Sequence, residues 1–155
     1  MKPTLLKLTG VFLILAGVFA SCKEPEEPVY PVNVSFTEYS LGSSCQWKNL
    51  SYDDKVIIIN SNEELKKYIE CKGESNYPAI DFSKSTLILA HGTANSSHIV
   101  LSKSLQQISE QNYEMKVNIL LTQLPYLTFW EMPIIVNKLN KTSIIYLVVT
   151  YKAYE

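Results

Sequence analysis

Tyr113-Glu114-Met115-Lys116-Val117-Asn118-Ile119-Leu120-Leu121 is the stretch that decides the fold class. Its odd-numbered side chains are all apolar, and the first three even-numbered side chains are charged or polar. Because successive side chains of a β-strand point to opposite faces, this alternation predicts a strand with one face in a core and the other in solvent.

Other β-prone segments lie on both sides of this strand. Residues 87–89 are apolar on both faces, which is typical of a central strand. A turn at Asn140-Lys141 separates the last two segments. The further predicted strands are 32–37, 56–59, 98–105, 104–111, 134–139 and 143–151.

One helix is predicted, from about residue 61 to residue 71. Ser61 is followed three residues later by Glu64, the spacing of a capping box in which each side chain bonds to backbone near the other. Leu65 and Ile69 then fall on one helical face. One early helix and many short strands predict an α+β fold, predominantly an antiparallel β-sheet or sandwich against which helix 61–71 packs.

The first 21 residues have the three regions of a secretion signal. Lys2 and Lys7 make its start basic, residues 8–20 are almost purely apolar, and small residues lead into Cys22. The apolar run is shorter than the roughly 20 residues that a membrane-spanning helix needs, so a cleaved signal is favoured. The alternative is an ordinary cleaved signal followed by an unrelated cysteine.

The segment Phe19-Ala20-Ser21-Cys22 resembles the lipobox of bacterial lipoproteins, with Phe at the position where Leu is usual. The resemblance implies that Cys22 is lipidated and anchors the protein to the cell envelope. The acidic, proline-containing tether 22–31 resembles the export signal of surface lipoproteins of Bacteroidetes-type bacteria, and a simple spacer is the alternative. We therefore expect a signal peptide 1–21, a lipidated tether 22–31 and a single α+β globular domain 32–155, held in the outer membrane and facing the periplasm or the cell surface.

Two further cysteines, Cys45 and Cys71, lie in the part that would be exported. In an oxidising compartment such a pair most simply forms one disulfide. A catalytic thiol is the alternative, but the sequence around neither cysteine suggests the base that a reactive thiol needs. We expect a disulfide between Cys45 and Cys71.

Charge and composition exclude nucleic acid as a partner. The formal net charge is −1, and all 14 basic residues are lysine. Bidentate recognition of phosphates and bases depends mainly on arginine, and nucleic-acid-binding domains carry a basic surface.

No cofactor, metal site or enzyme activity is expected. His91 and His98 flank the turn 92–97, so a hairpin there would bring the two imidazoles together, but no third zinc ligand lies in this stretch. Ser96, His98 and Asp81 supply the residue types of a hydrolase triad without the Gly-x-Ser-x-Gly segment that positions a serine.

The segment with the strongest claim to binding is Leu124-Pro125-Tyr126-Leu127-Thr128-Phe129-Trp130-Glu131-Met132-Pro133, interpreted as a loop. Aromatic residues dominate binding hot spots, which makes Tyr126, Phe129 and Trp130 candidate partner contacts, together with Trp47 from an earlier loop. The alternative is that this apolar loop folds over an open end of the sheet, with Phe129 and Met132 in the core.

Residues 56–152 also resemble, in the order of their elements, the C-terminal domain of protease-complex accessory lipoproteins. The resemblance depends on Asn62-Glu63-Glu64-Leu65 at a helix start, on Ile80-Asp81-Phe82-Ser83-Lys84 before a strand, and on the late strand Pro133-Ile134-Ile135-Val136-Asn137-Lys138-Leu139. The Gly-Gly-Tyr-like turn of that family is replaced here by Gly92-Thr93-Ala94-Asn95-Ser96-Ser97. The resemblance implies a non-catalytic extracytoplasmic domain that assists or restrains another protein.

Two functions are therefore expected. The first is a membrane-anchored interaction module, an accessory or inhibitory subunit of another envelope protein such as a protease. The alternative is a glycan-binding surface lipoprotein in which Trp130, Tyr126 and Trp47 stack on sugar rings.

Overall fold

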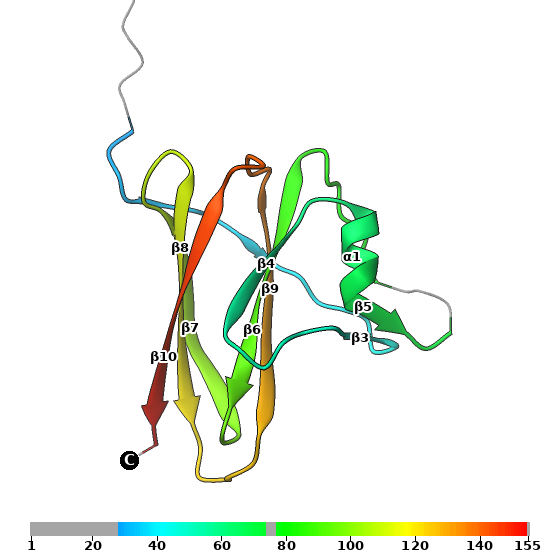
Figure 1. The fold of residues 1–155 in the computed structure, drawn as a ribbon, viewed down its shortest axis with the longest axis vertical. Coiled ribbons are helices and arrows are strands. Elements are labelled where there is room, and N and C mark those ends of the chain that lie inside the picture. The colour runs from blue at the N-terminus through cyan, green and yellow to red at the C-terminus, as the bar shows by residue number, and fades with distance from the viewer. Residues whose placement is uncertain (1–27, 74–76, 155) are drawn as a thin grey trace, which may run out of the picture.

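The computed structural model describes residues 28–73 and 77–154. The predicted signal peptide, the predicted lipidation site Cys22 and most of the predicted tether lie outside these residues. The described chain forms two four-stranded β-sheets that pack on a shared core, and a small two-stranded unit lies beside one of them (Figure 1).

Each large sheet combines strands from distant parts of the chain. The strand order is β1-β7-β8-β10 in the first, which we call the β8 sheet, and β2-β9-β6-β4 in the second, the β6 sheet. The β8 sheet contains β1 (Val32–Asn33), β7 (His98–Gln107), β8 (Asn112–Leu121) and β10 (Ile144–Ala153). The β6 sheet contains β2 (Thr37–Glu38), β4 (Lys55–Ile59), β6 (Ser85–Ala94) and β9 (Thr128–Asn137).

The main core lies between the two sheets and follows from the alternation of their strands. In β8 the odd-numbered side chains from Tyr113 to Ile119 are buried, as their sequence pattern predicts. The facing side chains of the β6 sheet are Ile88, Ala90, Trp130, Met132, Ile134 and Val136. The predicted class, an α+β sheet or sandwich with a single helix, is confirmed for the described residues.

One pairing departs from the antiparallel pattern. β8 and β10 run parallel, from Ile144 opposite Asn112 to Ala153 opposite Leu121. β9 lies between them in the sequence but belongs to the other sheet, so the chain crosses between the sheets twice and returns in its original direction. Hydrophobic alternation predicts that a segment is a strand, but it does not say which sheet the strand joins.

The predicted boundary between two strands near residue 104 is wrong. Residues 98–107 form one strand, β7, with a shift of register against β8 between Val100 and Ser102. An irregularity of this kind interrupts the alternation within a single strand, which explains why the pattern suggested two.

The helix begins where it was predicted to begin but ends three residues earlier. In α1 (Asn62–Tyr68), Ser61 is the N-cap, and its hydroxyl accepts a hydrogen bond from the Glu64 amide at 3.1 Å. The Glu64 carboxylate accepts one from the Asn60 amide at 2.6 Å. The prediction of helix up to residue 71 is wrong, because Ile69–Cys71 form strand β5, which pairs with β3 (Cys45–Trp47).

We call β3, α1 and β5 the disulfide lobe. It covers part of the outer face of the β6 sheet and projects to one side of the sandwich (Figure 1). A second apolar cluster fills this contact; its buried members are Tyr39, Ile59, Leu65, Ile69, Ile80 and Leu87. The lobe therefore packs on the outer face of the β6 sheet.

Candidate binding groove beside the disulfide lobe

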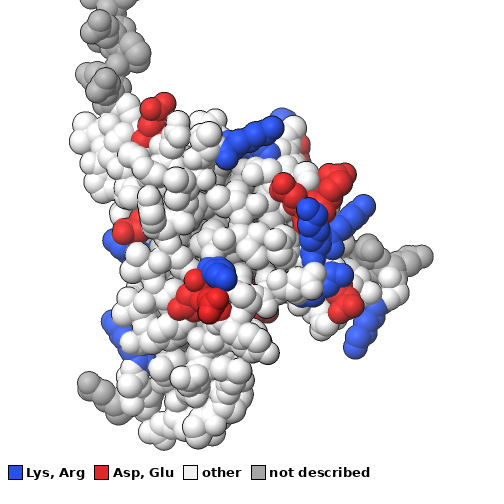
Figure 2. All heavy atoms as spheres, in the orientation of Figure 1, with Lys and Arg blue, Asp and Glu red and all other residues white. Residues whose placement is uncertain are grey.

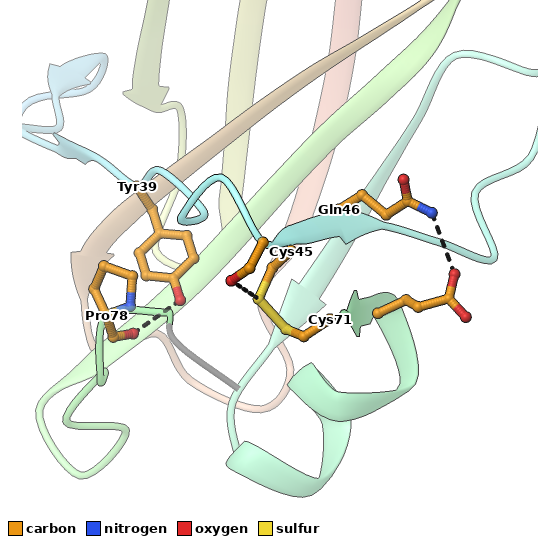
Figure 3. Close-up of a disulfide and its surroundings, with 7 residues drawn as sticks. Tyr39, Cys45, Gln46, Cys71 and Pro78 are labelled. Carbon is orange, nitrogen blue, oxygen red and sulfur yellow. Dashed lines mark hydrogen bonds between the residues drawn. A yellow bond between two sulfur atoms is a disulfide. The ribbon is translucent and has the colours of Figure 1, made fainter. Parts of the chain in front are cut away.

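The disulfide lobe is held by a cross-strand disulfide. Cys45 of β3 and Cys71 of β5 are opposite each other in the ladder, and their Sγ atoms are 2.02 Å apart, as expected from the sequence. Beside them the Gln46 amide donates to the Glu70 carboxylate at 3.2 Å (Figure 3). The disulfide thus fixes the strand that carries Trp47.

Tyr39 connects this lobe to the rest of the structure. Its ring lies 6.3 Å from the ring of Trp47, and its hydroxyl donates to the Pro78 carbonyl at 2.8 Å (Figure 3). Burial raises the pKa of Tyr39 to about 12, with a smaller contribution from Tyr77. Tyr39 is therefore a neutral hydrogen-bond donor at neutral pH, and it holds one side of Trp47 in place.

The segment predicted as a loop from residue 124 to residue 133 is a loop only in its first part. From Thr128 onward it is β9, in which Trp130 and Met132 point into the core and Phe129 and Glu131 point away from it. The strand was not predicted because Pro125 and Pro133 flank the segment and because its residues before Thr128 do not alternate between apolar and polar. The alternative placed both Phe129 and Met132 in the core: it is correct for Met132, which is buried, and wrong for Phe129, since 48% of that residue is exposed.

Pro133 is tolerated inside β9 because of the direction of its missing N–H. Its carbonyl accepts from the Tyr39 amide at 3.0 Å, on the edge of β9 that faces away from β6. In an antiparallel ladder the N–H and the C=O of one residue point to the same side. The absent donor of Pro133 therefore lies on that edge, and the ladder with β6 loses no hydrogen bond.

The prediction that Trp130 contacts a binding partner is wrong. Only 2% of it is exposed, and it belongs to the core between the sheets. Its indole Nε1 donates to the hydroxyl of Tyr151 in β10 at 3.0 Å. The indole that suggested a binding hot spot instead packs between the two sheets, and its hydrogen bond joins them.

The other three aromatic candidates are accessible, but they do not form one patch. Tyr126, 54% exposed, lies in the loop before β9, while Phe129 and the half-buried Trp47 line a common groove. Phe129 also packs against Tyr52, with the ring centroids 5.2 Å apart.

The groove has a volume of about 560 Å³ and runs between the disulfide lobe and β9. One wall comes from residues 39–41 and from β3, and the other from Phe129, Glu131 and Pro133. We call it the β9 groove. Aromatic and apolar side chains share its lining with the polar side chains of Ser40, Gln46 and Glu131.

Glu131 is the acidic group of the β9 groove. Its carboxylate takes part in none of the ion pairs among the described residues, and desolvation raises its pKa. A carboxylate that has lost part of its hydration and has no cation beside it is stabilised by a cationic group that enters the groove. Glu131 was not among the residues predicted from the sequence, although its position two residues after Phe129 places both side chains on one face of a strand.

His91 and His98 are not brought together. They lie on β6 and β7, which belong to different sheets, so the hairpin that would have paired them does not form. His91 is 2% exposed, its Nδ1 has no hydrogen-bond partner, and burial lowers its pKa. His98 Nδ1 lies 2.8 Å from Thr128 Oγ1, and burial lowers its pKa as well. No group of three or more potential metal ligands occurs among the described residues.

The residue types of a hydrolase triad are likewise dispersed. Asp81 accepts from the Ser83 amide and hydroxyl, and these bonds lower the pKa of its carboxyl. The Ser96 hydroxyl donates to the carbonyls of Ser97 and Thr122, and His98 contacts Thr128 instead. Each group therefore has a local structural partner.

A second exposed feature is the end of the sandwich that carries the loop 122–127. Exposed Ile99, Leu124, Tyr126, Leu127 and Tyr154 gather there, and we call them the apolar tip. Ile99, Leu124 and Tyr154 line one shallow hollow of about 510 Å³. Over the face that Figure 2 shows, the lowest part of this end is uncharged and lysine atoms lie only at its side, whereas lysines and carboxylates cluster on the disulfide lobe.

Comparisons with known proteins found no relative: no family model, no curated protein and no solved structure matches the chain. Within residues 28–73 and 77–154, no helix is sufficiently long and apolar to span a membrane.

Proposed function

We propose that this protein is an extracytoplasmic lipoprotein of the outer membrane, anchored through Cys22, that acts as a non-catalytic interaction module. In this proposal it is an accessory or inhibitory subunit of another envelope protein, for example a protease. The lipid anchor itself rests on the sequence, since Cys22 lies outside the described residues.

The observation that carries the proposal is the placement of the apolar tip. Residues 28–31 enter at one end of the sandwich, and the loop 122–127 lies at the opposite end (Figure 1). An anchor that precedes residue 28 would therefore direct the tip away from the membrane. Leu124 is 60% exposed and Tyr126 54%, and a contiguous apolar surface of this kind on a soluble domain marks a site of protein association.

The glycan alternative has less support. It used Trp130, Tyr126 and Trp47 as stacking platforms, but Trp130 is buried, and Tyr126 does not line the groove that contains Trp47. The three aromatic residues named for stacking therefore do not form one platform, and we treat glycan binding as an outcome of the test.

The test is purification of the tagged full-length lipoprotein from cross-linked envelopes. Leu124→Glu places a charge on the apolar tip, and Ile108→Glu, the matched control, places the same charge between β7 and β8 at the opposite end. We expect one stoichiometric protein partner whose recovery falls at least tenfold in Leu124→Glu and is unchanged in Ile108→Glu. Equal recovery from both variants, or no stoichiometric partner, would overturn the proposal, and retention on immobilised polysaccharide would favour the glycan alternative.

The anchor has its own test. Metabolic labelling with a tagged palmitate analogue should mark the parent protein and not Cys22→Ser, and the variant should leave the membrane fraction. A parent protein that is not labelled, or a variant that fractionates like the parent, contradicts the lipidation.

A further inference from the structure

The edge of β9 that faces away from β6 is covered over only part of its length. β2 pairs with it at Ile134 and Ile135, and the Tyr39 amide adds a bond to the Pro133 carbonyl. After Tyr39 the chain turns away toward the disulfide lobe, and no described strand pairs with this edge from Thr128 to Met132. The β9 groove lies along this uncovered edge.

The direction of the backbone groups on this edge can be derived from the ladder. The Pro133 carbonyl points toward β2, and the same holds for every second residue of β9. Glu131 and Phe129 are two and four residues before Pro133 in the same strand. Each therefore directs one N–H and one C=O toward the groove, while Trp130 and Met132 direct theirs toward β6.

The side chains around these backbone groups indicate what could pair with them. Phe129 and Trp47 offer apolar and aromatic surface to alternate side chains of an added strand. Glu131 offers a carboxylate that has no cation partner among the described residues. An unpaired backbone edge selects an extended peptide, and the carboxylate selects a basic residue within it.

We propose that the β9 groove binds an extended segment of the protein partner as an added strand beside Phe129 and Glu131, with a lysine or arginine of that segment opposite the Glu131 carboxylate. The segment would continue the line of β2 along β9. This inference rests on the proposed function, and it adds the mode of binding and the chemistry of the partner.

The same edge carries features that oppose pairing with another copy of itself. Pro133 supplies no donor, and two Glu131 carboxylates would approach each other in a symmetric pair. Charges and prolines on sheet edges prevent self-association in this way, while a partner with the opposite charge is still accepted.

The test uses the full-length protein in detergent and, as probe, twelve-residue peptides selected from a random display library. We expect the selected peptides to contain Lys or Arg and to protect the Phe129 and Glu131 amides from hydrogen exchange. In the free protein these two amides should exchange rapidly, while the Trp130 and Met132 amides should exchange slowly.

Glu131→Pro removes one of the two N–H groups that β9 offers to the added strand, the other being that of Phe129, and it keeps the ladder with β6. We expect it to weaken peptide binding at least tenfold, and we expect Glu131→Gln, which keeps the N–H and removes the charge, to weaken it about threefold. N-methylation at every second position of a peptide gives two sets, and the set that removes the N–H groups facing β9 should lose binding to the parent protein while the other set keeps it. This readout does not depend on the folding of a variant. Binding that is insensitive to N-methylation, or selected peptides that leave both amides unprotected, would overturn the inference.

The failure of this inference can be told apart from failure of the proposed function. If Leu124→Glu loses the envelope partner and Glu131→Pro retains it, binding by an added strand at the β9 groove is contradicted, while the proposed role as an interaction module is still supported. If no partner is recovered from the parent protein, the proposed function itself fails.

Discussion

The indole Nε1 of Trp130 donates a hydrogen bond of 3.0 Å to the hydroxyl of Tyr151 and so joins β9 of one sheet to β10 of the other. The same hydroxyl donates to the Asp54 carboxylate at 2.8 Å, just before β4. Burial, followed by the hydrogen bond to Asp54, raises the pKa of Tyr151 to about 12. These hydrogen bonds join β9, β10 and the residue that precedes β4 at one point of the sandwich.

Trp130→Ala should destabilise the whole fold. It removes a buried indole from the core, and we expect the free energy of unfolding to fall by about 3–5 kcal/mol. Tyr151→Phe leaves the Trp130 Nε1 without its hydrogen-bond acceptor, and this should lower the free energy of unfolding by about 1–3 kcal/mol. Urea denaturation followed by far-UV circular dichroism measures both values. A Trp130→Ala protein as stable as the parent would contradict the buried position of the ring.

Gly92→Ala should also be destabilising, although it adds only one methyl group. A Cβ at Gly92 would overlap the Asp54 carboxylate and lie 2.8 Å from the Trp130 ring. We expect a loss of about 1–3 kcal/mol from this overpacking, measured by thermal unfolding. Gly73→Asn is the matched control, because Gly73 has open space around it and asparagine tolerates its positive φ of 83°. Equal stability of the Gly92→Ala protein and the parent would argue against this close approach.

Removal of the disulfide should lower stability by about 3–4 kcal/mol on the chain-entropy model, because Cys45 and Cys71 are separated by 26 residues. The double variant Cys45→Ala and Cys71→Ala tests this without leaving a free thiol. Gln46→Ala, which removes only the exposed bond to Glu70, should change stability by less than about 0.5 kcal/mol. Non-reducing mass spectrometry of the parent checks the pairing, and two free thiols would contradict it.

Acidification from pH 7 to pH 5 should destabilise the protein through His91. Its pKa in the fold lies below the ordinary value of 6.5, chiefly because of burial. The unfolded chain therefore binds a proton at a higher pH than the folded chain, so stability is present above about 6.5 and is lost as the pH falls toward the lowered pKa. As the pH is lowered from 7 to 5, the free energy of unfolding should fall less steeply in the His91→Gln variant than in the parent protein.

Two other groups must be separated from this effect. Burial lowers the pKa of His98 too, so His98→Gln should remove a further part of the pH dependence. Glu131 acts in the opposite sense, because its pKa lies above the ordinary 4.5 and its stabilising contribution is lost as the pH rises through the raised value. The comparison is therefore made in a Glu131→Gln background, and an unchanged slope in His91→Gln would contradict the role of His91.

Local signals in the sequence predicted the elements well. The alternation from Tyr113 to Ile119 and the Ser61 and Glu64 cap depend only on neighbouring residues, and both occur as predicted. The end of the helix was not predictable in this way, because Ile69–Cys71 become a strand through pairing with β3, a segment about 25 residues earlier.

The candidate site was only partly predictable for the same reason. Aromatic content identified the region around Phe129 but could not separate Trp130, which points into the core, from Phe129, which points out, until β9 was recognised as a strand. Glu131 and Tyr39 acquire their place in the β9 groove from the packing of the disulfide lobe, a tertiary contact without a local sequence signal.

The alternation of β6 to β10 between the sheets also bears on how the chain acquires its structure. Among these five strands only β7 and β8 are sequence neighbours that pair directly, and β8 must wait for β10 to complete its ladder. Chains dominated by such distant pairings fold slowly, over about milliseconds to seconds. Until β10 has paired with β8 and β9 has covered the facing sheet, the chain exposes apolar strands and unpaired edges, and during that interval it is prone to aggregate.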